Sequence, residues 1–242
     1  MNSNQNWFKY WFNTPYYHLL YNNRNHKEAQ LFMSNLASFL KLKPGDFILD
    51  LACGKGRHSI YLNKLGFTVI GMDLSENSID VAKKSRTNSL DFIVHDMRQS
   101  FEDKYDAIFN LFTSFGYFKD DTDDLKVLQN IKAALKPNGV AVIDYLNIHK
   151  AIAELIPEEI EKRGPINFHI KRQVDGNFIN KEIRFNADHN DFFFSEHVKC
   201  LDLNTFKTYF KALDLQLVAI FGDYNLNPFD EINSERLILI FK

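Results

Sequence analysis

Acidic residues follow short apolar runs in the first hundred residues, where they could hold the polar parts of a ligand. Asp50 opens the segment DLACGKGRH, which places Gly54 and Gly56 between an apolar run and an amphipathic stretch. Two glycines at such a junction let the backbone turn tightly and approach a ligand, because no Cβ stands in the way. The pattern predicts a binding loop at the end of a strand, but it does not specify the ligand.

Two further acids indicate a nucleoside. Asp73 follows the next apolar run, nineteen residues after Gly54, where its carboxylate can accept hydrogen bonds from two ribose hydroxyls. Asp96 follows the third run and could accept from the exocyclic amine of a base, with Met97 as an apolar cover. For these acids, as for Asp50, the alternative role is to cap a helix or a turn.

The loop does not suit a pyridine dinucleotide. Ser59 occupies the place of the third glycine in the G-x-G-x-x-G pattern, and Asp50 would repel a pyrophosphate. The same carboxylate would attract an ammonium group or help to hold a sulfonium-bearing ligand. The residues therefore favour a cationic cofactor without phosphate.

The order of these motifs resembles that of class I S-adenosylmethionine-dependent methyltransferases. DLACGKG is followed by GMD, HDM, NLFTSFGYF and LKPNG, and GRHSIYLNKLGF is similar to the tellurite-resistance and small-molecule branch. The likeness covers roughly residues 27–148 and the last two strands, with Ala52 where the family usually has glycine. It implies an enzyme that uses S-adenosyl-L-methionine as cofactor and transfers a methyl group to a small-molecule acceptor by in-line displacement.

The resemblance also implies which residues hold the amino-acid end of the cofactor. Asn110 would offer its backbone carbonyl to the cofactor's ammonium group. Arg57 and Tyr21 are candidates for its carboxylate, since both side chains donate hydrogen bonds. The residues that would line the methionine end are Asp50, Ala52, Cys53 and Gly54.

The nucleoside end would be held by the following two strand ends. By the same resemblance, Asp73 would bind the ribose and Leu74 would face the adenine. Asp96 would accept from the adenine amine, with Met97 against the ring. No residues stand at metal-ligand spacing, so no metal is expected.

Methyl transfer requires alignment and exclusion of water more than a dedicated acid or base. If the acceptor must lose a proton, a base within reach would help. For the two histidines considered, the alternative is a place on the solvated face of a sheet. The candidate bases are His169, His197, Tyr117 and Tyr224.

Apolar runs alternate with amphipathic stretches from about residue 46 to 146, which predicts an α/β fold. We expect a Rossmann-like, doubly wound, mostly parallel seven-stranded sheet, whose last two strands (215–221 and 236–241) form an antiparallel edge hairpin. Pro137-Asn138-Gly139 is expected to turn the chain into the fifth strand. The other strands are expected at 46–52, 67–72, 91–95, 105–111 and 140–146, with helices at 58–65, 77–84, 123–135 and 205–213.

Four parts are expected along the chain. Residues 1–40, with an aromatic cluster and an amphipathic helix, would form an N-terminal helical lid over the cofactor-binding core at 41–150. Residues 151–203 would form a small antiparallel β insert covering the substrate, with strands at 169–174, 178–185 and 191–203. Residues 204–242 would supply the C-terminal helix and the last two strands of the core sheet.

Composition limits the other function classes. The 242 residues are 45% hydrophobic and 25% charged, which is typical of a soluble globular protein, and the formal charge of −2 without a basic run argues against duplex nucleic acid as a partner. No signal-peptide or membrane-spanning pattern occurs, so we expect a cytoplasmic protein, with both cysteines as free thiols. An RNA or protein methyltransferase and a non-catalytic cofactor-binding module stay open as alternatives, as do the acceptor, the atom that is methylated and the oligomeric state.

Overall fold

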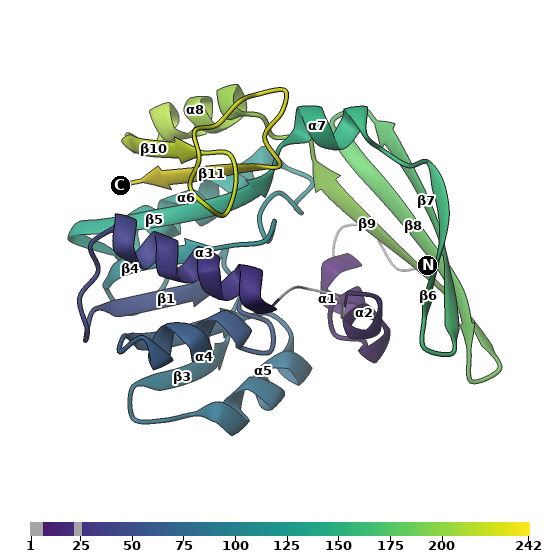
Figure 1. Ribbon diagram of the computed structural model, residues 1–242, viewed down its shortest axis with the longest axis horizontal. Helices are drawn as coiled ribbons and strands as arrows, with labels where there is room; N and C mark the ends of the chain where they lie inside the picture. Colours follow the sequence, from purple (N-terminus) through teal and green to yellow (C-terminus); the bar gives the residue numbers. More distant parts are fainter. Residues whose placement is uncertain (1–6, 22–25) are drawn as a thin grey trace.

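The computed structural model describes residues 7–21 and 26–242. Figure 1 shows a large sheet flanked by helices and a smaller, separate sheet beside it, with α7 (Ile148–Ala153) at the connection between the two. The large sheet has seven strands in the order β10-β11-β5-β4-β1-β2-β3. Its strands are β1 (Phe47–Leu51), β2 (Thr68–Asp73), β3 (Leu90–Val94), β4 (Tyr105–Asn110), β5 (Leu135–Leu146), β10 (Leu217–Phe221) and β11 (Arg236–Phe241).

Strand direction confirms the predicted fold class. β1 to β5 pair in parallel, whereas β11 is antiparallel to β5 and β10 is antiparallel to β11. The central strands are almost continuously buried, because helices cover both faces of the sheet. All five parallel strands therefore deliver their carboxyl ends to one edge, where ligands of open α/β sheets bind.

Helices from different parts of the chain cover the two faces. One apolar cluster joins the sheet to α3 (His26–Phe39), α4 (Arg57–Lys64) and α5 (Glu76–Ala82), and includes Phe32, Leu62 and Ile79. The other joins it to α6 (Asp121–Ala134) and α8 (Leu203–Ala212), and includes Ile131 and Phe206. The sheet is thus doubly wound, and a short 3-10 turn, η2 (Lys83–Ser85), follows α5.

The smaller sheet is antiparallel, as expected for the insert. Its strands are β6 (Glu158–Arg163), β7 (Ile166–Asp175), β8 (Phe178–Ala187) and β9 (Asn190–Lys199). Asp188 and His189, with φ of 50° and 63°, form the two-residue turn between β8 and β9, and both adopt the left-handed conformation that suits the twist of a hairpin. The expected strand at 191–203 is therefore shorter at its end, because α8 already begins at Leu203.

Two expectations need correction. Pro137-Asn138-Gly139 does not precede the fifth strand but lies within it, since Leu135 pairs with Tyr105 and Val140 pairs with Ala107. The four residues in between bulge from the ladder, so the turn-forming residues are accommodated as an irregularity of β5. β6 was not expected, because its sequence EEIEKR is dominated by charge.

The N-terminal region was expected to form one lid, but its helices lie in two different places. α1 (Trp7–Trp11) and α2 (Pro15–Leu20) lie between the two sheets, whereas α3 packs on the large sheet (Figure 1). Residues 1–6 and 22–25 of that region lie outside the described part of the chain. Of the helices that are described, none has the length and apolar character needed to span a membrane.

Candidate functional site

A cavity of about 340 Å³ opens at the carboxyl ends of β1, β2 and β4. Its volume falls within the range typical of small-molecule sites. The loops after β1, β2 and β3 form one wall, α1 and α2 form a second, and the loop after β4 forms a third. The predicted site residues that line it are Tyr21, Ala52, Cys53, Gly54, Arg57, Asp73, Leu74, Asp96, Met97 and Tyr117.

The glycine loop after β1 requires its glycines. Gly54 and Gly56 both have left-handed backbones, with φ of 57° and 79°. A Cβ at Gly56 would lie 2.5 Å from Cε1 of Phe92, so a larger residue there would displace the ring, whereas a Cβ at Gly54 would meet no atom within 4 Å. Gly56 therefore packs the loop against the sheet, and Gly54 leaves open space on the cavity side.

Asp73 is held by the backbone on both of its oxygens. Gly54 N donates to Oδ2 and Ser75 N donates to Oδ1, each over 2.8 Å. A carboxylate oxygen has two lone pairs, so each retains one for a ligand. This geometry fits a vicinal diol such as that of ribose. Burial raises the pKa of Asp73, in spite of the backbone N–H groups that favour its charged form.

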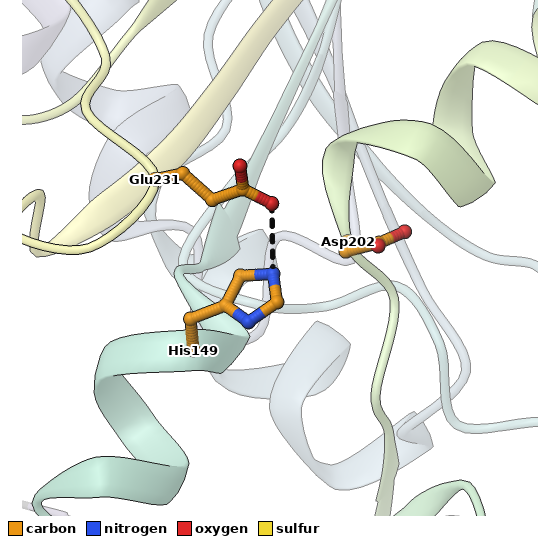
Figure 2. A group of neighbouring side chains, drawn as sticks. All are labelled: His149, Asp202 and Glu231. Atoms are coloured by element: carbon orange, nitrogen blue, oxygen red, sulfur yellow. Dashed lines mark ion pairs between the residues drawn. The ribbon is translucent and has the colours of Figure 1, made fainter.

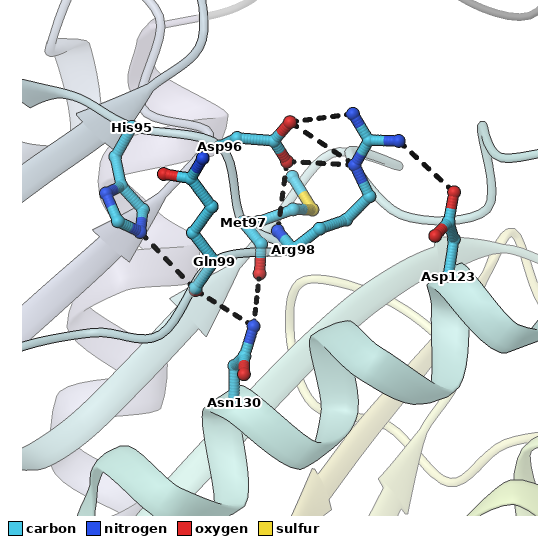
Figure 3. Close-up of polar contacts among 7 residues, drawn as sticks. All are labelled: His95, Asp96, Met97, Arg98, Gln99, Asp123 and Asn130. Atoms are coloured by element: carbon cyan, nitrogen blue, oxygen red, sulfur yellow. Dashed lines mark hydrogen bonds and ion pairs between the residues drawn. The ribbon is translucent and has the colours of Figure 1, made fainter.

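Asp96 is shared with an arginine that sequence reasoning missed. Arg98 donates from its backbone N and its Nε to Oδ1, both over 3.0 Å, and from Nη2 to Oδ2 over 2.7 Å (Figure 3). Although burial opposes ionisation, these contacts lower the pKa of Asp96. The predicted contact with an adenine amine must therefore compete with Arg98 for the same oxygens.

The loop that carries Asp96 and Met97 is anchored from α6. Asn130 Nδ2 donates to the backbone carbonyls of Met97 and Gln99, over 3.0 and 2.9 Å (Figure 3). Arg98 also reaches Asp123 of α6 over 3.2 Å. These contacts fix the position of Met97 on the cavity wall, as expected for an apolar cover.

Two predicted residues do not reach the wall. Asp50 points toward α4, where Ser59 Oγ donates to its Oδ2 over 2.5 Å, and burial raises its pKa to about 6. It supports the loop from the side of α4. The Asn110 side chain is buried and donates to the Leu51 carbonyl over 3.2 Å, while its Oδ1 has no hydrogen-bond partner within the described residues. The predicted contact of the Asn110 backbone carbonyl with the cofactor's ammonium group stays a prediction. Leu111, the next residue, does line the cavity.

Comparison with known proteins decides the family. Residues 42–189, more than half of the chain, match the family described as "Methyltransferase domain". The chain belongs to this methyltransferase family. This confirms the predicted class I methyltransferase, whereas the tellurite-resistance branch stays a prediction.

Curated relatives match this chain over part of their length. The chain is 37% identical over 115 residues to a putative methyltransferase, YqeM, of Bacillus subtilis, covering 46% of each chain. It is 31% identical over 117 residues to glycine N-methyltransferase of Rattus norvegicus, covering 41% of this chain and 40% of that protein. The chain thus spans less than half the length of these relatives.

Solved structures share the fold over nearly the whole chain. An S-adenosylmethionine-dependent methyltransferase from Clostridium acetobutylicum superposes with a TM-score of 0.79 at 20% identity, covering 94% of this chain and 95% of that one. The CcbJ methyltransferase from Streptomyces caelestis gives 0.75 at 16% identity, covering 89% of each. At these identities the likeness shows the fold alone, and it includes the smaller sheet.

Of the four candidate bases, Tyr117 lies on the cavity wall, where its hydroxyl donates to the Thr113 carbonyl. His169 is exposed on β7. His197 pairs with Asn180 and lines a different, polar hollow of the smaller sheet. Tyr224 packs beside the core and donates to a buried carboxylate instead. These last three are not among the residues that line the cavity, because their strands and loops direct them elsewhere.

An aromatic wall faces the strand ends. Its members come from α1, α2, the residues directly after these helices, and the loop after β4, and their rings contact one another, two of the pairs edge to face. The predicted lid function of this region stays a prediction. We call this set the aromatic wall: Phe8, Phe12, Tyr17, Tyr21, Tyr117 and Phe118.

Tyr21 is held by buried charges of the smaller sheet. Its hydroxyl donates to Glu196 over 2.7 Å, and Lys181 Nζ donates to the hydroxyl oxygen over 2.7 Å. Burial raises the pKa of Tyr21 well above its usual range, and the Glu196 charge acts in the same direction. The tyrosine is therefore neutral. The Tyr21 hydroxyl hydrogen is directed to Glu196, whereas Arg57 carries a charged guanidinium on the cavity wall, so the structure favours Arg57 over Tyr21 as the partner of a ligand carboxylate.

One group of side chains that could ligate a metal occurs in the described part of the chain, and none of its members lines the cavity. The ligand atoms of His149, Asp202 and Glu231 lie within 4.8 Å of one another (Figure 2). Asp202 caps α8 by accepting from Thr205 N over 2.7 Å, and His149 Nε2 pairs with Glu231 over 3.0 Å. The group lies at the N-terminal ends of α7 and α8, whose positive potential opposes a cation. We therefore assign these residues a structural role.

Proposed function

We propose that this protein transfers the methyl group of S-adenosylmethionine to a small-molecule acceptor. The observation that carries the proposal is the carboxylate of Asp73 on the cavity wall, fixed by one backbone N–H on each oxygen and retaining one lone pair on each. Such a group matches the two hydroxyls of a ribose. The family match supports a methyl donor as the molecule that carries this ribose.

The remaining wall residues support the rest of the cofactor. Leu74 and Met97 offer apolar surfaces to the cavity that Asp73 also lines, and an adenine ring would lie against them. At the other end, Arg57 offers a guanidinium group to the carboxylate of an amino-acid tail. The open space beside Gly54 leaves room for the chain between them.

The aromatic wall supports a small acceptor. Cofactor and acceptor must share a cavity of about 340 Å³, which α1 and α2 border on the side away from the strands. This arrangement suits a small molecule better than a folded polymer. The names of several similar proteins also support a small acceptor. They include glycine N-methyltransferase, ubiquinone biosynthesis O-methyltransferase and the sugar N-methyltransferase KedS8.

The chain's own residues would bind, orient and dehydrate the reactants. S-adenosylmethionine supplies an electrophilic methyl group on a sulfonium centre. Asp73 and Arg57 would fix the two ends of the donor, so that the methyl group has one orientation toward the acceptor. The aromatic wall would exclude water and surround the reacting centre with polarisable faces. Tyr117 keeps its proton directed to Thr113, so it would position the acceptor as a neutral group.

Turnover with a labelled methyl donor tests the proposal. Purified protein is incubated with methyl-labelled S-adenosylmethionine and a metabolite extract, separated into small-molecule and macromolecular fractions. We expect label in the small-molecule fraction, and its loss in Asp73→Ala. Label confined to RNA or protein would contradict the small acceptor. Binding of S-adenosylhomocysteine by calorimetry without any transfer would indicate a non-catalytic module.

A further inference from the structure

Two adjacent residues in the loop after β4 adopt a conformation that side chains disfavour. Phe112 and Thr113 have φ of 59° and 57°, and neither is glycine. The left-handed region is unfavourable for any residue other than glycine, and a β-branched residue such as Thr113 is a rare occupant. Such a backbone persists where surrounding contacts hold it in place.

Asp144 of β5 supplies most of those contacts. Its Oδ2 accepts from Phe112 N over 2.7 Å, and its backbone carbonyl accepts from Thr113 N over 2.9 Å. Both strained residues are therefore hydrogen-bonded to the same partner. The Asp144 side chain has no exposed surface, so its charge needs a nearby cation.

Arg236 of β11 is that cation. Its Nε donates to Asp144 Oδ1 over 2.7 Å, while its Nη2 donates to Thr113 Oγ1 over 2.9 Å. The planar guanidinium thus connects the buried carboxylate and the strained loop in a single geometry. Tyr224 donates to Oδ2 of Asp144 over 3.3 Å, the same oxygen that accepts from Phe112 N. Arg236 and Tyr224 both lie beyond residues 42–189, the part that matches the family.

The loop held in this way presents Phe112 to the cavity. The Phe112 ring stacks on the His58 ring, with centroids 4.7 Å apart and planes 9° apart. The guanidinium carbon of Arg57 lies 5.4 Å from the centroid of the same ring, and Arg57 Nη2 lies 2.8 Å from His58 Nε2. Phe112 is therefore the surface against which Arg57 and His58 are arranged, and all three line the cavity.

We propose that Arg236 and Asp144 are positioning residues that hold Phe112, and through it Arg57, against the amino-acid tail of the cofactor. The inference rests on the proposed function and adds a specific role for the last strand. Its consequence is selective. Loss of the ion pair should lower the affinity for ligands that carry the tail, while the nucleoside contacts around Asp73 stay intact.

Two ligands that differ in the tail separate this role from general stability. S-adenosylhomocysteine carries the amino-acid tail, whereas 5′-methylthioadenosine has the same nucleoside and sulfur without it. Calorimetry with both is carried out on the full chain and on Arg236→Met. We expect affinity for S-adenosylhomocysteine to fall about tenfold, the scale of losing a charge-assisted hydrogen bond, and affinity for 5′-methylthioadenosine to change by less than about twofold. Arg236→Lys, which keeps the charge but cannot make both contacts, should lie between.

A second variant and a control keep the test decisive if Arg236→Met folds poorly. Phe112→Leu leaves the ion pair in place and removes the ring surface, so it should give the same selective loss. Lys199→Met breaks a different buried ion pair, to Asp124, and should lower stability while leaving the ratio of the two affinities unchanged. This control separates a loss of stability from a loss of position.

Each outcome decides the matter. An equal loss for both ligands in Arg236→Met or Phe112→Leu would overturn the role in tail positioning, as would unchanged affinity for both. If the unmodified protein bound neither ligand, the proposed function would be overturned and this inference with it. If it bound both equally well, the cofactor assignment would stand through the nucleoside and the tail contact would be wrong.

Discussion

The backbone N–H of Gly54 donates to Oδ2 of Asp73 over 2.8 Å, which joins two motifs nineteen residues apart in the sequence. β1 and β2 pair in parallel with Leu51 opposite Met72, so the residues that follow the two strands leave the sheet side by side. The glycine loop and the acid are therefore one structure. Ser75 completes it by donating to the other oxygen.

This relationship predicts a specific loss of binding in Asp73→Ala. The variant removes the acceptor for the ribose and also the partner that fixes Gly54 N. We expect affinity for S-adenosylhomocysteine to fall by about 1 to 3 kcal/mol, the cost of leaving buried polar groups unpaired. Calorimetry measures this change in affinity. Glu76→Gln, at an exposed site three residues further on, is the control and should bind as the unmodified protein does. Unchanged affinity in Asp73→Ala would remove this residue from the site.

The local pattern of apolar and polar residues was sufficient to predict the parallel strands of the large sheet. Each parallel strand is a short apolar run, and segments with the apolar spacing of a helix separate these runs. The parallel topology then places the carboxyl end of each of these strands at the same edge of the sheet. For that reason the places of Gly54, Asp73 and Met97 on the cavity wall follow from their positions at strand ends. The two-residue turn at Asp188 was also readable, because turn-forming residues separate two strand-like runs.

Contacts between distant segments were not predictable in this way. Arg236 and Asp144 are 92 residues apart, and nothing in either neighbourhood specifies that β11 pairs with β5 in the register that brings them together. The direction of a side chain within a strand is a similar case. Asp50 ends an apolar run as Asp73 does, yet it points toward Ser59 of α4 and not into the cavity. One residue of register decides which face a strand side chain occupies.

Burial of Asp50 predicts a pH-dependent stability difference. Its pKa rises from 3.8 to about 6 on folding, so below about pH 4 the carboxyl is protonated in both states. As pH rises through 6, the folded protein must bury a charge, and the free energy of unfolding falls by about 3 kcal/mol, at about 1.4 kcal/mol per pKa unit. Asp50→Asn lacks this loss while it can still accept from Ser59. The variant's advantage in free energy of unfolding should therefore grow by about 3 kcal/mol between pH 4 and pH 7.

Urea denaturation at several pH values measures this difference. Asp80→Asn, on the exposed side of α5, serves as the control and should differ from the unmodified protein by the same amount throughout. A constant gap for Asp50→Asn over the same range would show that Asp50 is ionised at no cost, contrary to its burial.

The N-terminal helices should depend on Glu196 for their attachment. Trp11 is fully buried, and its Nε1 donates to Glu196 over 2.7 Å while its ring stacks on Phe194. Trp11→Phe keeps an aromatic ring but leaves the carboxylate with one donor fewer, so the free energy of unfolding should fall by about 2 to 3 kcal/mol. Denaturation of Trp11→Phe, Glu196→Gln and the double variant forms a cycle. The double variant should lose less than the sum of the two, and strict additivity would mean that the contact contributes nothing.

Lys199 is a buried charge that the proposed function does not use, and its role should be purely structural. Its side chain is 2% exposed and pairs with Asp124, which has no exposed surface, and with Asp121 over 2.7 Å. Burial raises the pKa of Asp124 to about 6 in spite of the lysine. In Lys199→Met this carboxyl loses its main partner, so the free energy of unfolding should fall by about 3 to 5 kcal/mol at pH 8.

The loss in Lys199→Met should be smaller at low pH, because an unpaired buried carboxyl keeps its proton more readily and a neutral group is less costly to bury. Lys199→Met combined with Asp124→Leu removes both charges and should recover most of the stability, since apolar residues of similar volume pack well in such positions. Urea denaturation of the three proteins at pH 5 and pH 8 measures all of these differences. A double variant no more stable than Lys199→Met would mean that the side chain of Lys199 acts through packing and not through the charge of Asp124.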